Sequence, residues 1–107
     1  MNLPPVISRY IEANNAHDVK TIVDCFGNDG VVRDENATRR GKIDIERWAT
    51  ETIQKYKFQF KPLTADGRGA KTILSIEVSG SFPGSPLMLA YHFTIAKDKI
   101  QSLIIDS

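Results

Sequence analysis

In the first half of the chain, apolar residues recur with the spacing of amphipathic helices. A first helix is predicted from the stripe Leu3, Val6, Ile7, Tyr10, Ile11 and Asn14. Asp18 is a suitable N-cap for a second helix, whose stripe is Val19, Ile22, Val23 and Phe26. We predict a turn over residues 27–30 and a short strand over residues 31–34, followed by a polar loop that ends at Gly41. A third helix is predicted from Ile45, Trp48, Ala49, Thr52, Ile53 and Tyr56.

From residue 57 onward the apolar pattern has a period of two, which is typical of strands with one buried face. The alternating sets are Phe58 and Phe60; Leu74, Ile76 and Val78; and Leu87, Leu89, Tyr91, Phe93 and Ile95. Segments rich in turn residues, 65–69, 80–86 and 97–99, separate these strands, and "IQSLIID" closes the sheet. Helices followed by strands favour a single α+β domain over residues 1–107, with three N-terminal helices covering one side of an antiparallel sheet.

Composition narrows the class of protein. A chain of 107 residues suits one domain, and its 14 basic and 13 acidic residues give a net charge of only +1, so neither nucleic acid nor a membrane surface is an expected partner. The first fifteen residues do not resemble a secretory signal, which favours a cytoplasmic protein. The single Cys25 cannot form an internal disulfide and is expected in the core.

The predicted strand over residues 31–34 ends in acids. Val32 and Asp34 point to the same side of an extended chain, so Asp34 faces inward if Val32 does. Burial of an unpaired carboxylate is costly and calls for an explanation. One explanation is structural, with Asp34 accepting hydrogen bonds from backbone N–H groups of the next loop. The other is functional: Asp34 lies in an apolar cavity, where desolvation raises its pKa toward a value useful in catalysis.

The order of the predicted elements resembles the nuclear transport factor 2-like superfamily, which includes ketosteroid isomerases and SnoaL-like polyketide cyclases. The segments that carry the resemblance are "RYIEANNAHD", "IVDCFGNDGVVRDE", "RRGKIDIERW" and "GSFPGSPLMLAYHFTIAKDKIQSLII". The resemblance implies a cystatin-like fold, in which a curved, cone-shaped sheet, mostly antiparallel, is closed by the helices over a pocket. It also implies a homodimer formed through the outer face of the sheet.

The resemblance extends to site residues. In the isomerase branch a tyrosine on the first helix donates a hydrogen bond to the substrate oxygen, and its position is Tyr10 here. An aspartate on the first short strand moves the proton, in a V-x-D pattern that Val32 and Asp34 match. Tyr91 takes the position of a second, protonated acid just before "HF", and the third-helix position that often carries a supporting tyrosine is Ala49. A division of roles between such acids is established for ketosteroid isomerase.

Aromatic residues on the predicted inner faces are expected to form the pocket wall: Trp48, Phe26, Phe58 and Phe93. The expected ligand is a small apolar or carbonyl-containing molecule, with no cofactor and no metal. His92 alternates onto the outer sheet face and is expected at the surface or in the dimer interface, whereas His17 is expected in a solvated turn. Arg33 faces outward beside Asp34, which disfavours the aspartate and arginine set with which one relative opens epoxides.

Two functional hypotheses follow. The first is a cofactor-independent isomerase or cyclase that moves a proton next to a carbonyl, with Asp34 as the base and Tyr10 as a donor to the developing oxyanion. The second is a non-catalytic protein of the same fold that binds an apolar ligand or another protein. The sequence leaves both open.

Overall fold

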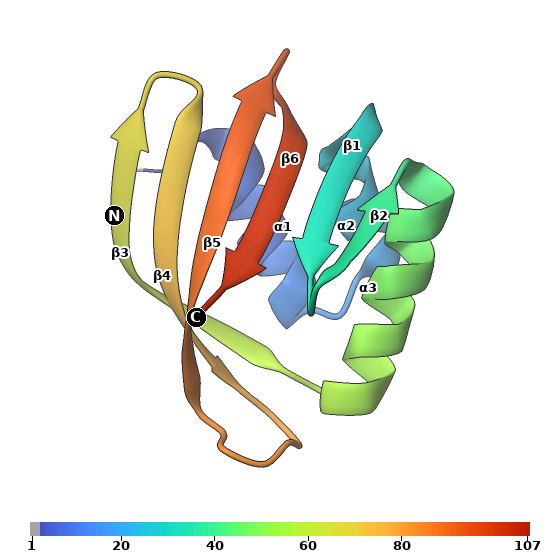
Figure 1. Ribbon diagram of the computed structural model, residues 1–107, viewed down its shortest axis with the longest axis vertical. Helices are drawn as coiled ribbons and strands as arrows, with labels where there is room; N and C mark the ends of the chain where they lie inside the picture. Colours follow the sequence, from blue (N-terminus) through green and yellow to red (C-terminus); the bar gives the residue numbers. More distant parts are fainter. Residues whose placement is uncertain (1–2) are drawn as a thin grey trace.

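The computed structural model describes residues 3–107 and contains one six-stranded sheet with helices packed against it (Figure 1). Along the chain the elements are α1 (Pro5–Asn15), α2 (Val19–Asp24), β1 (Phe26–Asp34), β2 (Ala37–Arg40), α3 (Lys42–Tyr56), β3 (Gln59–Arg68), β4 (Lys71–Ser79), β5 (Leu87–Ala96) and β6 (Lys99–Asp106). The strand order is β2-β1-β6-β5-β4-β3, with β1 and β6 parallel and every other pair antiparallel. The predicted α+β class, with a mixed and curved sheet, is confirmed.

The core lies between the inner face of the sheet and the helices behind it (Figure 1). Helix α1 directs Ile7 and Tyr10 toward the sheet, and both side chains are fully buried. The facing strand residues are the ones that alternate in the sequence, among them Leu74 on β4, Phe93 on β5 and Leu103 on β6. Burial of these apolar side chains is the main favourable contribution to folding, since each stabilises the fold by about 1.5–3 kcal/mol relative to an exposed position.

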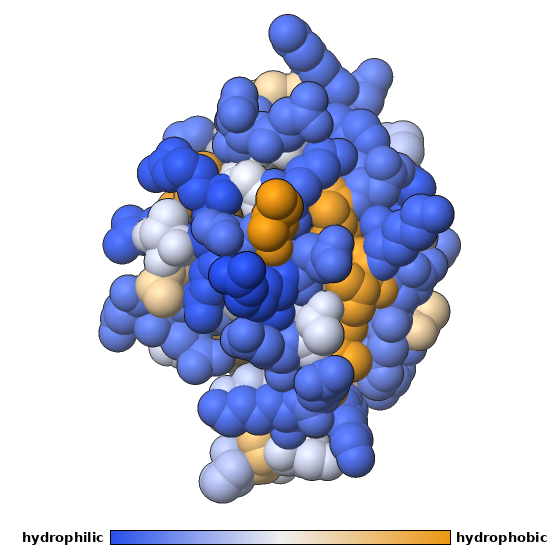
Figure 2. All heavy atoms as spheres, turned by 90° about the vertical axis from the view of Figure 1, so that its right-hand side faces the viewer, coloured by the Kyte–Doolittle hydropathy of each residue, from blue (hydrophilic) through white to orange (hydrophobic). Residues whose placement is uncertain are grey.

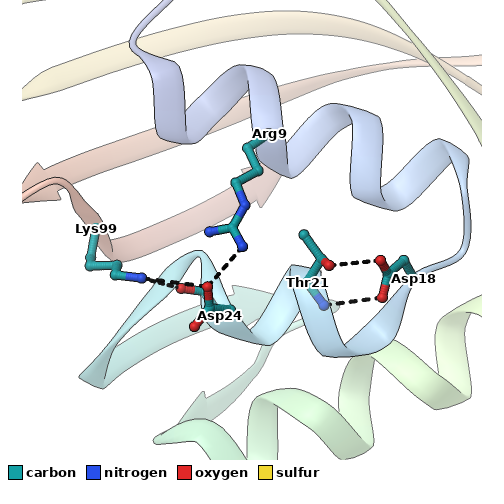
Figure 3. A network of polar contacts seen from close by, with 5 residues as sticks. All are labelled: Arg9, Asp18, Thr21, Asp24 and Lys99. Atoms are coloured by element: carbon teal, nitrogen blue, oxygen red, sulfur yellow. Dashed lines mark hydrogen bonds and ion pairs between the residues drawn. The ribbon is translucent and has the colours of Figure 1, made fainter.

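Polar contacts fix the short helix α2 beside α1 (Figure 3). The Asp18 carboxylate accepts hydrogen bonds from the backbone N–H of Thr21 at 3.2 Å and from its hydroxyl at 2.7 Å, so the predicted N-cap is confirmed. At the other end of α2, Arg9 forms an ion pair of 2.8 Å with Asp24, and Lys99 donates to the Asp24 carbonyl oxygen at 2.7 Å. A six-residue helix is too short to be stable alone, so these contacts and its buried Ile22 hold it.

Helix α3 covers the edge of the sheet next to β2 (Figure 1) and buries Ile45, Trp48 and Ala49. The side of the molecule with α3 and β2 is mostly hydrophilic, with apolar side chains confined to a narrow strip and a small isolated spot (Figure 2). The predicted amphipathic helix is confirmed. None of the helices within residues 3–107 has the length and apolar character that a membrane crossing requires.

The region around β1 differs from the prediction. Helix α2 ends at Asp24, and Phe26 begins β1 instead of completing the helical stripe. Residues 27–30, predicted to be a turn, lie within β1 as an irregular stretch where the register against β6 shifts. The backbone is crowded there, because a Cβ on Gly30 would lie 3.1 Å from the Gly27 carbonyl oxygen. The predicted loop before Gly41 contains the short strand β2, which pairs antiparallel with β1.

Strand β3 is longer than the alternation indicates. It continues through residues 65–68, where a break was predicted, and pairs with β4 as far as Arg68 and Lys71. These residues are exposed on an edge strand, so they need no apolar alternation to be extended.

The prediction that His17 lies in a solvated turn is wrong. His17 is partly buried, its Nε2 lies 2.7 Å from the Phe58 carbonyl oxygen, and its ring packs edge-on against the Phe58 ring.

Candidate functional site

A cavity of about 690 Å³ lies between the inner face of the sheet, α1 and α3. Its volume is in the range of small-molecule sites. Aromatic side chains make up much of its wall: Tyr10, Trp48, Tyr56, Phe58, Phe60, Phe82 and Tyr91. The polar groups among them include Asp34 at the end of β1 and Asn14 on α1. An apolar cavity with a few polar groups suits a small organic ligand.

Asp34 lines this cavity from the last position of β1. Val32, two residues earlier, is fully buried, so the inward side of the strand carries Asp34 into the interior. Trp48 on α3 donates its indole N–H to Asp34 Oδ2 at 3.1 Å. Burial raises the pKa of Asp34 above the ordinary value, while the hydrogen bond from Trp48 acts in the opposite direction. The carboxylate is therefore a stronger base than one in water, and one of its oxygens is held in place.

Tyr10 lines the same cavity from α1. Its side chain is fully buried, and within residues 3–107 its hydroxyl is the one buried side-chain polar atom without a hydrogen-bond partner. Asn14, one turn further along α1, donates its Nδ2 to the Tyr10 backbone carbonyl oxygen at 2.7 Å and not to the hydroxyl. Burial raises the pKa of Tyr10, the nearby Asn14 side chain acts in the opposite direction, and the negative charge of Asp34 raises it further. The phenol therefore stays protonated and can donate a hydrogen bond to a ligand.

Tyr91 on β5 adds another phenol to the cavity besides Tyr10 and Tyr56, and it is 4% exposed. Burial raises its pKa well above the ordinary value, and the negative charge of Asp34 contributes in the same direction. The Asp34 carboxylate thus acts electrostatically on both Tyr10 and Tyr91. The structure brings together in one cavity the three residues that the family resemblance assigned to the site.

The pocket wall differs in part from the prediction. Trp48 and Phe58 line the cavity as expected, but Phe26 and Phe93 do not. Both are almost fully buried, and their rings pack edge-on against Tyr10 at centroid distances of 5.8 and 5.6 Å. They lie in the solid core that supports Tyr10. Alternation along a strand identifies inward residues, but it does not separate the core from a cavity.

A two-residue turn between β1 and β2 contributes Glu35 and Asn36 to the cavity mouth. Both residues have positive φ, 53° and 61°, as in the turns that connect tight hairpins. Asn tolerates this conformation well, whereas Glu rarely adopts it. The Tyr56 hydroxyl donates to Glu35 Oε1 over a long 3.4 Å. Arg39 closes the hairpin by donating to the Asp34 carbonyl oxygen at 2.9 Å.

The loop between β4 and β5 forms the other side of the mouth. It extends past the rest of the sheet toward the C-terminal end of α3 (Figure 1) and places Phe82 and Pro83 at the cavity. The Ser81 N–H donates to the Tyr56 carbonyl oxygen at 2.7 Å, and the Phe82 and Tyr56 rings pack edge-on. Only glycine fits at position 80, because a Cβ there would lie 2.5 Å from that same carbonyl oxygen.

Sequence reasoning missed the mouth residues Glu35, Tyr56 and Phe82 as well as Asp106 at the end of β6. Their side chains meet only in three dimensions, and the sole local signal was the pair of residues at the hairpin turn.

Within residues 3–107 no group of three or more His, Cys, Asp or Glu side chains could hold a metal ion. Arg33 is exposed on the opposite side of β1 from Val32.

Comparison with known proteins identifies the family of the chain. The sequence profile of the SnoaL-like domain family matches residues 7–103. A protein from Sinorhizobium meliloti, described as a candidate polyketide cyclase, is similar to 97% of this chain over 95% of its own length, with 35% identity and a TM-score of 0.94. No curated protein matches the chain at a significant level.

More distant structures share the fold. A protein with a ketosteroid isomerase-like fold from Catenulispora acidiphila, solved with trimethylamine, has 18% identity and a TM-score of 0.88, covering 99% of this chain and 87% of its own. A cystatin-fold protein from Novosphingobium aromaticivorans has 18% identity and a TM-score of 0.84, covering 100% of this chain and 99% of its own. The cystatin-like fold predicted from the sequence is confirmed.

Proposed function

Because the chain belongs to the SnoaL-like domain family, in the nuclear transport factor 2-like superfamily, we propose that it is an isomerase or cyclase that needs no cofactor. Its substrate is an apolar carbonyl compound, and the reaction begins with transfer of a proton from the carbon next to the carbonyl. The similarity to a candidate polyketide cyclase supports the reaction class. The observation that carries the proposal is a buried, unpaired Tyr10 hydroxyl in the same cavity as a carboxylate of raised pKa.

In the proposed first step an Asp34 carboxylate oxygen takes the proton. The C–H bond breaks, and its electron pair moves into a new C=C bond while the carbonyl oxygen becomes an enolate oxygen. Tyr10 and Tyr91 donate hydrogen bonds to that oxygen, where the negative charge develops. Desolvation of the phenols and the carboxylate strengthens these interactions relative to water.

The second step returns Asp34 to its ionised form. In an isomerisation the protonated Asp34 delivers the proton to a different carbon of the same enolate. In a cyclisation the enolate carbon attacks an electrophilic carbon of the same molecule. The attacked carbon carries an oxygen, which either keeps a single bond to that carbon or leaves, and this oxygen takes the proton from Asp34. Trp48 holds one oxygen of Asp34 during both steps, so Trp48 is a positioning residue.

Deuterium exchange tests the proposal without knowledge of the natural substrate. The protein is incubated with 2-tetralone in deuterated buffer, and loss of the α-proton signals is followed by NMR. We expect exchange faster than in buffer, with a loss of about 10²–10⁴-fold in Asp34→Asn, because a positioned base contributes about that factor. Glu51→Gln, which changes one exposed carboxylate on α3 outside the cavity, is the control. Equal exchange by the protein and Asp34→Asn contradicts the proposal and leaves ligand binding as the function.

We also propose that two copies of the chain associate through the outer face of the sheet. Ile73, Met88 and Ile104 are 42%, 53% and 40% exposed there. Ile73 and Ile104 flank His92 in one row across β4, β5 and β6, and His92 contacts Asp106 at 3.2 Å. Exposed apolar side chains that lie side by side on one face are typical of an interface.

A further inference from the structure

The charges around the cavity are unbalanced. Asp34 and Glu35 contribute carboxylates to its lining, whereas the Asp106 carboxylate contacts His92 on the outer face of the sheet. No lysine, arginine or histidine is among the described residues that line the cavity. Acidic residues alone do not make a site. Here, however, they lie in a cavity that also holds the unpaired and fully buried Tyr10 hydroxyl, which is a donor without an acceptor.

An anionic ligand is disfavoured in such a cavity. On entering, a carboxylate or phosphate loses its water and finds neutral phenol donors but no cation to balance its charge. It also lies next to Asp34, and like charges repel one another more strongly where water is excluded. Neutral carbonyl compounds meet neither cost, since Tyr10 and Tyr91 can donate to a carbonyl oxygen.

The mouth favours a positive charge. Glu35 is exposed there, and its only hydrogen bond from a side chain in the described residues is the long one from the Tyr56 hydroxyl. The rings of Tyr56 and Phe82 border the same opening, and aromatic faces attract ammonium groups. The positive φ of Glu35 is not special in itself, because Lys97 has a similar backbone conformation at the turn between β5 and β6. Glu35 is important for ligand binding because of its position at the cavity mouth.

Cationic side chains that lie near the cavity but do not line it weaken the preference of the mouth for a positively charged ligand without removing it. Arg39 donates to the Asp34 carbonyl oxygen, and the Lys55 ammonium lies 5.1 Å from the centre of the Tyr56 ring. His92 contacts the Asp106 carboxylate. Because Glu35 is exposed and Lys55 is near, the gain for a ligand cation is the modest one of a surface ion pair, up to about fivefold in affinity.

We propose, on the premise of the function above, that the substrate is an apolar carbonyl compound without a negative charge, and that a protonated amine at its outer end strengthens binding through Glu35. Carboxylate-bearing and phosphorylated compounds of the same skeleton are rejected by the cavity.

Three derivatives of 2-tetralone test this inference. They carry an aminomethyl, a hydroxymethyl or a carboxylate group at one ring carbon, and calorimetry measures their binding at pH 7.5 and low ionic strength. We expect the carboxylate to bind at least about tenfold more weakly than the hydroxymethyl probe, because it enters without a partner charge. The aminomethyl probe should bind up to about fivefold more tightly.

Variants locate the source of the preference. Glu35→Gln should remove the advantage of the amine, whereas Glu51→Gln, the same loss of charge on the exposed side of α3, should leave it unchanged. Glu35→Lys should bring the carboxylate probe close to the hydroxymethyl probe. Because position 35 is exposed in a turn, these variants are expected to fold.

The outcomes separate the two proposals. Carboxylate binding as tight as that of the hydroxymethyl probe, an amine advantage that survives Glu35→Gln, or no binding of any probe overturns the charge preference. If the predicted order of affinities holds while the hydroxymethyl probe undergoes no deuterium exchange, only the catalytic proposal fails.

Discussion

Two regions of the interior, both bordered by the Tyr10 ring, differ in how completely side chains fill them. On one side Phe26 and Phe93 pack edge-on against this ring, and Phe26 is fully buried. On the other side Tyr91 and Trp48 surround a cavity of about 690 Å³. We refer to these regions as the filled core and the cavity.

The filled core and the cavity contribute in opposite directions to the stability of the fold. The filled core supplies apolar burial, and it fixes the Tyr10 ring so that its hydroxyl reaches the cavity without a partner. The cavity region keeps groups that reduce stability, namely an unpaired hydroxyl and a partly desolvated carboxylate. Unfavourable groups of this kind are common at functional sites and depend on a stable surrounding structure.

The largest expected difference between the two regions is in stability. Phe93→Ala, in the filled core, should lower the free energy of unfolding by about 3–5 kcal/mol, because it leaves a void among fully packed side chains. Phe82→Ala, at the cavity mouth, should cost less than about 1 kcal/mol, because its ring is only partly buried. Urea unfolding followed by circular dichroism measures both. Equal losses would mean that the mouth is a structural part of the fold.

Tyr10→Phe sharpens the comparison at the boundary of the two regions. The ring keeps its contacts with the filled core, while a buried hydroxyl without a partner is removed, so the free energy of unfolding should rise by about 1 kcal/mol. Deuterium exchange should fall by about 10²-fold, the usual cost of one oxyanion donor. A loss of stability in the same unfolding experiment would show that the hydroxyl has a partner in the folded protein.

Asp34→Asn should raise the thermal midpoint by a few degrees at pH 7. The folded-state pKa of Asp34 is raised, so the neutral acid stabilises the fold fully below its unfolded pKa of about 3.8, and this stabilisation is lost as the pH rises through the folded value. The amide of Asn keeps an oxygen for the Trp48 N–H and has no charge to desolvate. Thermal melts should converge below about pH 4. A variant that is less stable than the parent at pH 7 contradicts the raised pKa.

The smallest expected effect concerns the outer sheet face. Ile104→Lys should increase the dissociation constant of the proposed dimer, because it places a charge among the exposed apolar side chains. Ile43→Lys, at a 77% exposed position on α3, is the matched control and should leave association unchanged. Analytical ultracentrifugation over a range of concentrations measures both. A monomeric parent chain, or equal effects of the two substitutions, argues against this interface.

The sequence predicts the filled core better than the cavity for a physical reason. Packed residues such as Ile7 and Leu74 must be apolar at a regular spacing, so periodicity reveals them. Strand β2 and the outer part of β3 are polar and lie at the two edges of the sheet, where no alternation is required. For this reason the sequence-based prediction missed strand β2 and made strand β3 too short.

The residues of the candidate site also fall into two groups, those that the sequence identified and those that only the folded structure brings to the cavity. Asp34 and Tyr10 were identified because the family resemblance attaches a role to their positions, and inward parity supported Asp34. Glu35 and Phe82 reach the cavity only through turn geometry and a loop that packs on α3, which no local pattern encodes. Phe26 and Phe93 were assigned to the wall because an inward aromatic residue gives the same signal in a core as in a cavity.

The pH profile of deuterium exchange into 2-tetralone tests the central claim most directly, because it links the exchange to the ionisation of one partly buried carboxylate. For the parent protein the rate should rise with pH through a single ionisation above the ordinary pKa of an aspartate, about 3.8, and then level off. Asp34→Asn should lose this rise. A parent profile without that ionisation, or one that Asp34→Asn reproduces, would contradict the assignment of Asp34 as the base.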